Sequence, residues 1–215
     1  MTRTDRPDFD HLVYATRDLS ATSADLAART GVEPSGGGRH DGVGTQNRLA
    51  SLGDTGYLEL IGPDPDQPRP AAPLPFSLDS LDRPRLMGWA VATSDLEDTL
   101  ARARAAGHDP GEIVAMSRTR PSGEVLAWRM TVGEEMPGSN VIPFLIDWGA
   151  TSADAHPAAT SALGLELVGI RAMHPDAGRI QAVLDALGVE LRVEAAPQAA
   201  LEATLATPRG RVVLH

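Results

Sequence analysis

Two ionisable side chains, His11 and Glu59, each lie inside a short apolar run of this sequence. In the run 57–62, alternation places Glu59 on the same strand face as Tyr57 and Ile61. A carboxylate among apolar neighbours costs free energy unless it is paired or bound to a metal. This pattern indicates one of two roles for His11 and Glu59. They belong to a functional site, as metal ligands or a general base, or they form a structural hydrogen bond with each other in the core.

A glycine-rich passage at 36–47, GGGRHDGVGTQN, contains His40, Thr45 and Asn47. Its glycines would let the backbone approach a ligand closely, although they also serve ordinary turns. No lysine follows, so the passage is a weak phosphate-binding signal. Thr45 and Asn47 alternate along the next predicted strand and could point into a pocket together. We expect His40, Thr45 and Asn47 to line that pocket, with an ordinary turn as the alternative.

Residues 87–148 contain the three tryptophans, Trp89, Trp128 and Trp148, all within predicted strands. Core packing is their ordinary role, and the sharper hypothesis is an aromatic wall that faces the two ionisable side chains described above. Arg118 and Arg120 precede a Pro-Ser-Gly turn. Either guanidinium could hold an anionic substrate through two hydrogen bonds, or both could be solvated residues of a hairpin.

The elements that would position these residues occur in the same order in two segments. The first has a strand at 9–16, a helix at 18–31 and three strands up to residue 62. The second has a strand at 87–93, a helix at 95–107, and strands at 113–120, 124–132 and 140–148. The two segments begin with the similar frames DHLVYATRDL and GWAVATSDL. Such a repeat indicates two copies of one unit that cover each other's apolar faces.

Residues 63–85 separate the two segments and are dense in proline, which interrupts both helices and sheets. We therefore expect a linker there, within one paired domain at 8–150. A third, weaker segment at 160–215 again has the order of a strand, a helix and three short strands. Because it has no counterpart within the chain, it would either cover the cavity or pair through its exposed edge with its copy in a homodimer.

The composition excludes several classes of chemistry. The chain has 215 residues, a formal net charge of −10 and no cysteine, so disulfides, thiolate nucleophiles and cysteine-ligated metals are excluded. All 19 basic residues are arginine, which rules out a Schiff base on lysine. The negative charge disfavours nucleic acid, and no apolar run suits a membrane span or a signal peptide. We expect a cytoplasmic protein with a small-molecule ligand and without nucleic-acid or membrane partners.

Six short motifs, in this order, resemble the glyoxalase-like domain family of the vicinal oxygen chelate superfamily. They are DHLVYAT at 10–16, GGGRHDGVGTQN at 36–47, YLELIG at 57–62, RPSGEVLAW at 120–128, PFLIDW at 143–148 and HP at 156–157. The resemblance covers about residues 8–215. It implies an α+β fold in which repeated βαβββ modules form a curved, cup-shaped mixed sheet around a cavity, with a third, smaller βαβββ-like module at 160–215.

The resemblance also implies a divalent metal, such as Zn, Ni, Mn, Mg or Fe, held at equivalent strand positions of the two modules. His11 and Glu59 match two ligand positions. Overlaying DHLV on GWAV, and YLELIG on FLIDWG, places Trp89 and Ile146 at the other two, with Asp147 one step away on the opposite face. No nucleotide cofactor is expected.

The activity implied by the resemblance is that of a lyase or isomerase on an oxygenated substrate, in which Glu59 or His40 moves a proton. The missing ligands in the second module favour an alternative, a non-catalytic binding protein of the drug-sequestering kind. An extradiol-type dioxygenase is less favoured, because it needs two histidines and a carboxylate, and His40 would have to supply the third ligand.

Overall fold

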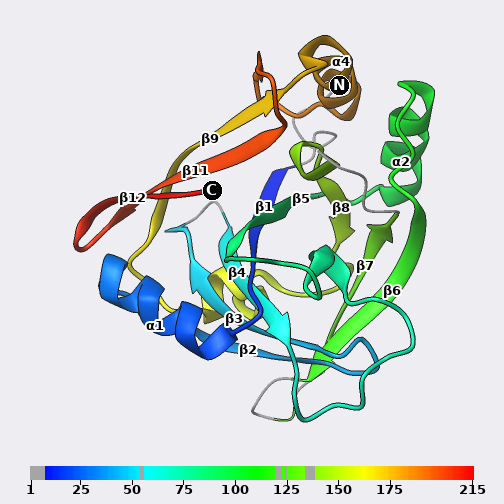
Figure 1. The fold of residues 1–215 in the computed structure, drawn as a ribbon. Coiled ribbons are helices and arrows are strands. Elements are labelled where there is room, and N and C mark those ends of the chain that lie inside the picture. The colour runs from blue at the N-terminus through cyan, green and yellow to red at the C-terminus, as the bar shows by residue number, and fades with distance from the viewer. Residues whose placement is uncertain (1–7, 54–55, 120–122, 124, 134–138) are drawn as a thin grey trace.

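Two sheets organise the computed structural model, which describes residues 8–53, 56–119, 123, 125–133 and 139–215. Eight strands pair in the order β1-β4-β3-β2-β6-β7-β8-β5 and close into a barrel (Figure 1). Their bounds are β1 Asp8–Ala15, β2 Ser35–His40, β3 Thr45–Ser51, β4 Tyr57–Pro63, β5 Arg85–Ala92, β6 Glu112–Thr119, β7 Val125–Val132 and β8 Phe144–Asp147. A second sheet has the order β10-β9-β11-β12, formed by β9 Glu166–His174, β10 Val193–Ala195, β11 Ala200–Thr207 and β12 Gly210–Leu214.

The helices begin where the sequence places capping residues. Asp18 caps α1 (Leu19–Thr30) by accepting a hydrogen bond from Ala21 N–H, and Asp95 caps α2 (Leu96–Ala105) in the same way. Helix α4 (Ala177–Leu187) follows Asp176 and ends at a left-handed glycine. The shorter helical segments are η3 Pro75–Ser77, η4 Ser139–Val141, η5 Ala153–Ala155 and α3 Pro157–Thr160. The fold is thus mixed α+β and rich in strands, as expected.

The sheet differs from the expected open cup because its two ends meet. β1 pairs antiparallel with β5 along most of its length, which joins the two halves on one side. On the other side β2 is joined to β6, and among the residues that the structure describes the pair is Arg39 with Thr119. The closure gives the barrel an interior cavity that is lined by side chains from both halves of the sheet.

The segment predicted as a linker, 63–85, is packed against the barrel. Leu74, Leu78 and Leu81 are buried in a small hydrophobic cluster with residues of β1 and β4. Phe76, in η3, reaches the barrel interior and has φ of 56°, a left-handed conformation that is uncommon outside glycine. Proline prevents regular elements here without preventing burial, so the prediction from proline content missed the role of this segment.

The second sheet lies outside the barrel (Figure 1) and shares one large hydrophobic cluster with it. Members of that cluster include Leu184 of α4 and Leu205 of β11, together with Leu96 of α2 and Trp89 of β5. None of the residues that line the interior cavity comes from 160–215, so this segment does not cover the cavity. Within the part of the chain described, no helix has the length and apolar character needed to cross a membrane.

Candidate active site

A cavity of about 520 Å³ occupies the barrel interior, and all eight strands contribute to its wall. Five consecutive strands of the ring, β1, β4, β3, β2 and β6, each place a polar side chain on that wall. In this order they are His11, Glu59, Asn47, His40 and Arg118, and all five are buried. Residues far apart in the sequence therefore meet along one continuous row, called the polar row below.

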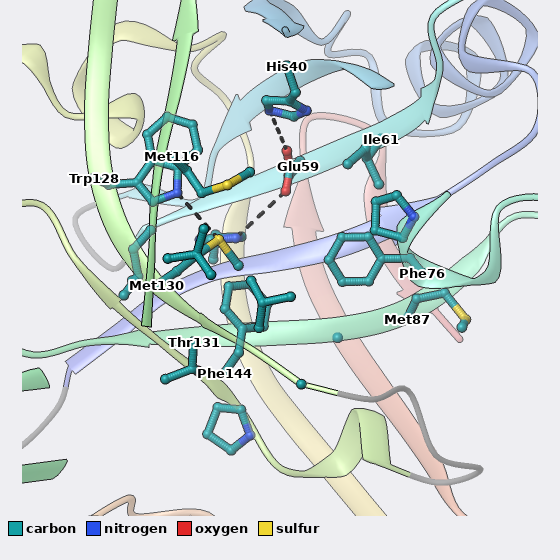
Figure 2. Close-up of a pocket in the computed structure, with 18 of the residues that line it drawn as sticks. His40, Glu59, Ile61, Phe76, Met87, Met116, Trp128, Met130, Thr131 and Phe144 are labelled. Atoms are coloured by element: carbon teal, nitrogen blue, oxygen red, sulfur yellow. Dashed lines mark hydrogen bonds and ion pairs between the residues drawn. The ribbon is translucent and has the colours of Figure 1, made fainter. Parts of the chain in front are cut away.

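Glu59 lies close to three other members of the polar row, and Figure 2 shows it beside His40. Its Oε1 accepts a hydrogen bond of 2.5 Å from Asn47 Nδ2, and its Oε2 lies 3.7 Å from His11 Nε2. On the other side, His40 Nε2 lies 3.9 Å from Oε1. Because Asn47 occupies one carboxylate oxygen, the other oxygen is the one available to His11 and to a ligand in the cavity.

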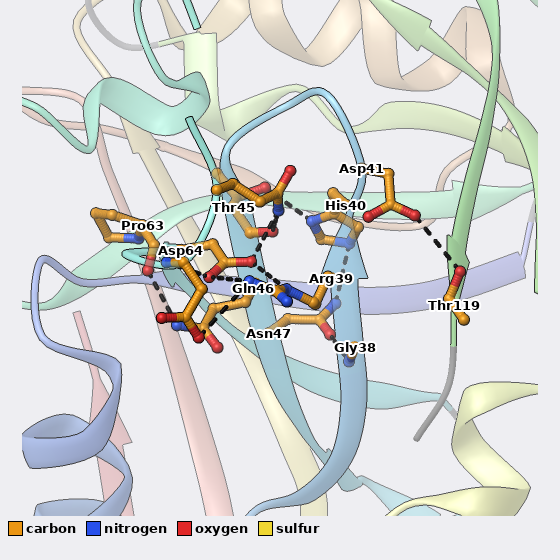
Figure 3. A network of polar contacts seen from close by, with 12 residues as sticks. Gly38, Arg39, His40, Asp41, Thr45, Gln46, Asn47, Pro63, Asp64 and Thr119 are labelled. Atoms are coloured by element: carbon orange, nitrogen blue, oxygen red, sulfur yellow. Dashed lines mark hydrogen bonds and ion pairs between the residues drawn. The ribbon is translucent and has the colours of Figure 1, made fainter. Parts of the chain in front are cut away.

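Asn47 and His40 are each held in one orientation by their neighbours (Figure 3). The backbone N–H of Gly38 donates to Asn47 Oδ1 at 2.9 Å, so the amide nitrogen faces Glu59 and His40. His40 Nε2 accepts from this nitrogen at 3.3 Å, which leaves Nδ1 to donate to Thr45 Oγ1 at 2.8 Å. Burial lowers the pKa of His40, so the ring is neutral. With both ring nitrogens bonded, His40 is better suited to orient Asn47 than to transfer protons.

The glycine run that contains Gly38 serves the closure of the barrel. A Cβ at position 38 would lie 2.4 Å from the carbonyl oxygen of Thr119 on β6, a distance that no side chain tolerates. Glycine thus lets β2 approach β6 while its N–H holds Asn47. The close contact in this passage is between two strands of the protein.

An ion pair fixes the strand that contains His40 to the start of the 63–85 segment (Figure 3). Asp64 accepts hydrogen bonds from Arg39 Nε at 2.6 Å and Nη2 at 3.0 Å, and from Gln67 Nε2 at 2.8 Å. The hydrogen bonds from Arg39 lower the pKa of Asp64 to about 2. The segment that supplies Phe76 to the cavity is therefore fastened to β2.

His11 is oriented by the adjacent residue, Asp10. A register shift between Phe9 and His11 in the pairing with β5 leaves Asp10 as an extra residue, and such a bulge re-aims neighbouring side chains. His11 Nδ1 lies 2.5 Å from Asp10 Oδ1. Burial by itself would raise the pKa of Asp10, but the hydrogen bonds from His11 and His156 outweigh it and hold the pKa below its usual value. Asp10 is thus ionised, Nδ1 of His11 carries a proton, and Nε2 faces Glu59.

The remaining strands, β7, β8 and β5, form an apolar wall of the cavity (Figure 2). Its large side chains include Trp128 and Met130 of β7, Phe144 of β8 and Met87 of β5, with Phe76 from the 63–85 segment. A site with ionisable groups along one side and apolar groups along the other suits an oxygenated small molecule that has an apolar body.

Of the remaining residues predicted for the site, three line the cavity and one does not. Trp128, Trp148 and Arg118 line the cavity. Trp89 does not, because it lies on the outer face of β5, where it is buried and donates from Nε1 to the carbonyl of Val141 at 3.0 Å. The expected aromatic wall therefore lacks Trp89. Arg120 lies outside the described residues.

Matching hydrogen bonds relate the two halves of the barrel. Thr16 follows β1 and Thr93 follows β5, and their backbone N–H groups donate to the carbonyls of Ile61 and Ile146 respectively, each at 2.9 Å. These two threonines and two isoleucines give fixed points from which positions in the first half can be compared with positions in the second.

Counting back from those fixed points, the counterpart of His11 is Gly88, and the counterpart of Glu59 is Phe144. The overlay that put Trp89 opposite His11 is therefore wrong by one residue, since the two frames differ in length. The overlay that put Ile146 opposite Glu59 is wrong by two, because the glycine used to align them lies inside β4 in one half and after β8 in the other.

The donor set does not fit the divalent metal that the resemblance implied. In the described part of the chain, no three or more His, Asp or Glu side chains are grouped so that they could hold a metal. His11 and Glu59 offer two donors, their counterparts Gly88 and Phe144 offer none, and His40 Nε2 is engaged by an amide. A facial triad for an iron dioxygenase lacks its third ligand for the same reason. Asp147, which the overlay placed nearby, is paired instead with Arg129 at 2.6 Å.

Several residues of the site carry no sequence signal. Asp10 and His11 are neighbours in a strand, and alternation would send them to opposite faces. The bulge that brings them together requires Gly56, whose Cβ would lie 2.0 Å from the carbonyl oxygen of Asp10. Met116 and Met130 line the cavity from β6 and β7 but resemble any core residue in the sequence. Only the pairing of strands could have identified them.

Comparisons with known proteins agree with this architecture. The structure resembles a hypothetical protein from Staphylococcus aureus, with a TM-score of 0.65, 13% identity, and coverage of 90% of this chain and 88% of that one. A variant of 4-hydroxymandelate synthase from Streptomyces coelicolor gives 0.52 at 13% identity, over 97% of this chain and 63% of that one. A Streptomyces coelicolor methylmalonyl-CoA epimerase variant gives 0.44 at 19% identity, over 68% and 97%. At these identities the first two likenesses concern the fold alone.

In sequence, no curated protein matches the chain. Residues 9–188, however, match the glyoxalase-like domain family, and this stretch includes the polar row and the barrel apart from its first residue, Asp8. The chain therefore belongs to the glyoxalase-like domain family of the vicinal oxygen chelate superfamily.

Proposed function

We propose that this protein is a lyase or isomerase that moves a proton on a small oxygenated substrate bound inside the barrel. The observation that carries the proposal is the convergence of His11 Nε2 and Glu59 Oε2, 3.7 Å apart, on one cavity. Two groups that can each exchange a proton, close enough to act on one ligand, are what such a reaction needs.

In the proposed reaction Glu59 takes a proton from the carbon next to a substrate carbonyl. The electron pair of the broken C–H bond moves to the carbonyl oxygen, which becomes an enolate. The guanidinium of Arg118, buried in the wall of the cavity, provides the positive charge that stabilises this oxygen. Glu59 returns this proton to the substrate directly, or passes it to the unprotonated Nε2 of His11, which then delivers it to the substrate, and either route completes an isomerisation. No metal takes part in these steps.

The neighbours of the pair support these roles. Asp10 holds the proton on His11 Nδ1, which leaves Nε2 directed toward Glu59. Asn47 fixes the Glu59 carboxylate by its other oxygen. His40, with both ring nitrogens bonded, holds Asn47 and is assigned no proton transfer. The geometry is thus set before a substrate arrives, which is the condition for efficient acid–base catalysis.

Deuterium exchange tests the proposal because it follows the proton transfer itself and requires no identified product. The protein is incubated in D2O with 2-oxo and 2-hydroxy carboxylates that differ in their apolar part, and incorporation at carbon is followed by NMR. We expect exchange in at least one compound, abolished by Glu59→Gln and by His11→Asn. Glu33→Gln, at an exposed position, and His174→Asn, at a half-buried position outside the cavity, serve as matched controls. Exchange that persists in both site variants would refute the proposal.

The apolar wall supports a second candidate function, binding without turnover. Met87, Met116, Met130 and Trp128 can adapt to a planar or apolar ligand. Titration followed by tryptophan fluorescence, alongside the exchange assay, separates the two functions. Saturable quenching without any exchange or product would support sequestration over catalysis.

A further inference from the structure

Asp10 accepts three hydrogen bonds, one from the adjacent residue and two from the segment that follows β8. Its Oδ1 accepts from His11 Nδ1 at 2.5 Å. Its Oδ2 accepts from Trp148 Nε1 at 2.8 Å and from His156 Nε2 at 3.1 Å. Asp10 is 2% exposed, so these three donors are what keep its charge inside the protein. The loop after β8 thereby reaches back to the strand that holds His11.

The orientation of the His156 ring follows from its second contact. Its Nδ1 accepts from the backbone N–H of Ala158 at 3.2 Å, at the start of α3. The proton must then be on Nε2, the atom that faces Asp10. The ring is packed edge-on against Trp148 and Tyr57, with centroid separations of 5.0 and 5.7 Å. His156 is thus fixed by packing, by a backbone donor and by Asp10.

We infer that His156 is a positioning residue for His11 and acts through the carboxylate of Asp10. Together with Trp148 it holds Oδ2, so that Oδ1 is directed at His11 Nδ1 and the lone pair of Nε2 faces the cavity. The inference rests on the proposed function for its catalytic meaning, because His11 is assigned the proton transfer there.

His156 does not act as a proton relay for His11. A proton passing from His11 to His156 would have to rest on Asp10. Burial alone would raise the pKa of Asp10, but the hydrogen bonds from His11 and His156 outweigh burial and hold this pKa below its usual value. Asp10 is therefore a poor proton acceptor. The role left to His156 is to set the direction and the basicity of the carboxylate. Removing one donor makes a carboxylate more basic and strengthens its remaining hydrogen bonds.

Two substitutions separate this role from that of a helix cap. His156→Asn keeps an acceptor where Nδ1 lies, and asparagine is a good N-cap, but its side chain is too short to reach Asp10. His156→Gln places an amide nitrogen near the position of Nε2 and so keeps a donor for Asp10, while it loses the cap. His174→Asn is the matched control, because His174 also precedes a proline and also accepts from the N–H two residues on, at 2.9 Å.

The readout is the set of NMR signals from the His11 ring in protein labelled with ¹⁵N-histidine. These signals are assigned by their loss in His11→Asn. The wild type should show a low-field Nδ1 proton and an unprotonated Nε2. We expect this proton to move further downfield in His156→Asn and to stay in place in His156→Gln and His174→Asn. In the exchange assay, His156→Asn should lower the rate while His156→Gln retains it.

An unchanged His11 signal in His156→Asn would overturn the inference and leave His156 as a helix cap. Because the spectrum requires no substrate, its outcome is independent of the proposed function. A protein that gives the expected spectra but no exchange with any substrate would refute the proposed reaction and keep the link between His156 and His11. Circular dichroism of each variant confirms that the fold is intact.

Discussion

Asn47→Asp places a second carboxylate against Glu59 and tests the polar row directly. In the wild type, Asn47 Nδ2 donates to Glu59 Oε1 at 2.5 Å, and the other end of the amide is held by Gly38 N–H. The new side chain has almost the same shape, so one oxygen keeps the bond to Gly38 and the other faces Glu59. A donor is replaced by a charged acceptor without any change in volume.

The magnitude follows from the separation of the two charges. At about 4 Å and an effective dielectric constant of about 20, two carboxylates repel by about 4 kcal/mol. The pair can avoid this by binding a proton, which costs about 1.4 kcal/mol for each pH unit above about 4. That cost is about 5.6 kcal/mol at about pH 8 and about 2 kcal/mol at about pH 5.5. We therefore expect the free energy of unfolding to fall by about 4 kcal/mol at the higher pH and by about 2 kcal/mol at the lower.

Urea unfolding of the wild type and of Asn47→Asp at both pH values measures this loss in the free energy of unfolding. The folded variant binds more protons than its unfolded chain, so its deficit must shrink as the pH falls. Gln198→Glu, at an exposed position, controls for the added negative charge. A deficit that is equal at the two pH values, or none at either, would mean that the side chains of Asn47 and Glu59 do not meet and would refute the geometry.

Three further outcomes follow from the same structure. Glu59→Gln keeps an acceptor for the amide of Asn47 and removes a buried charge. The free energy of unfolding should therefore stay equal or rise by about 1 kcal/mol, while exchange activity falls by about 10²–10⁴-fold. A large loss of stability would contradict the reasoning about the buried charge. The folded pKa of Asp64, about 2, lies below its ordinary value of 3.8, so pairing with Arg39 stabilises the protein above pH 3.8 and this stabilisation is lost as the pH falls toward 2. Because Arg39 is half-exposed, the free energy of unfolding should fall by about 1 kcal/mol between about pH 5 and pH 2 in the wild type and not in Arg39→Gln. Parallel pH profiles of the two proteins would rule out a stabilising pair. After incubation with Zn²⁺ or Mn²⁺ and dialysis, elemental analysis should find no stoichiometric metal, and a full equivalent that His11→Asn removes would contradict the reasoning from the donor set.

Local signals in the sequence predicted the elements well. Asp18 and Asp95 cap α1 and α2 because a side chain that accepts from a backbone N–H three residues on depends on nothing distant. The alternation in β4 likewise placed Glu59 on the same face as Tyr57 and Ile61, since a strand turns successive side chains to opposite faces.

What depends on pairing between strands could not be predicted. The partner of His11 is its own neighbour, Asp10, and the bulge responsible is defined only against β5. The counterparts Gly88 and Phe144 required hydrogen bonds between distant strands, because aligning the two frames by their ends placed them wrongly. Phe76 was missed because proline content says where helices and strands stop and nothing about which side chains are buried.

The most direct measurement is a crystal structure of the protein with the compound that exchanges fastest in D2O. We expect the compound inside the barrel, with the exchanging carbon about 3–3.5 Å from Glu59 Oε2 and within reach of His11 Nε2. A compound bound outside the barrel, with both side chains beyond contact, would contradict the assignment of the site.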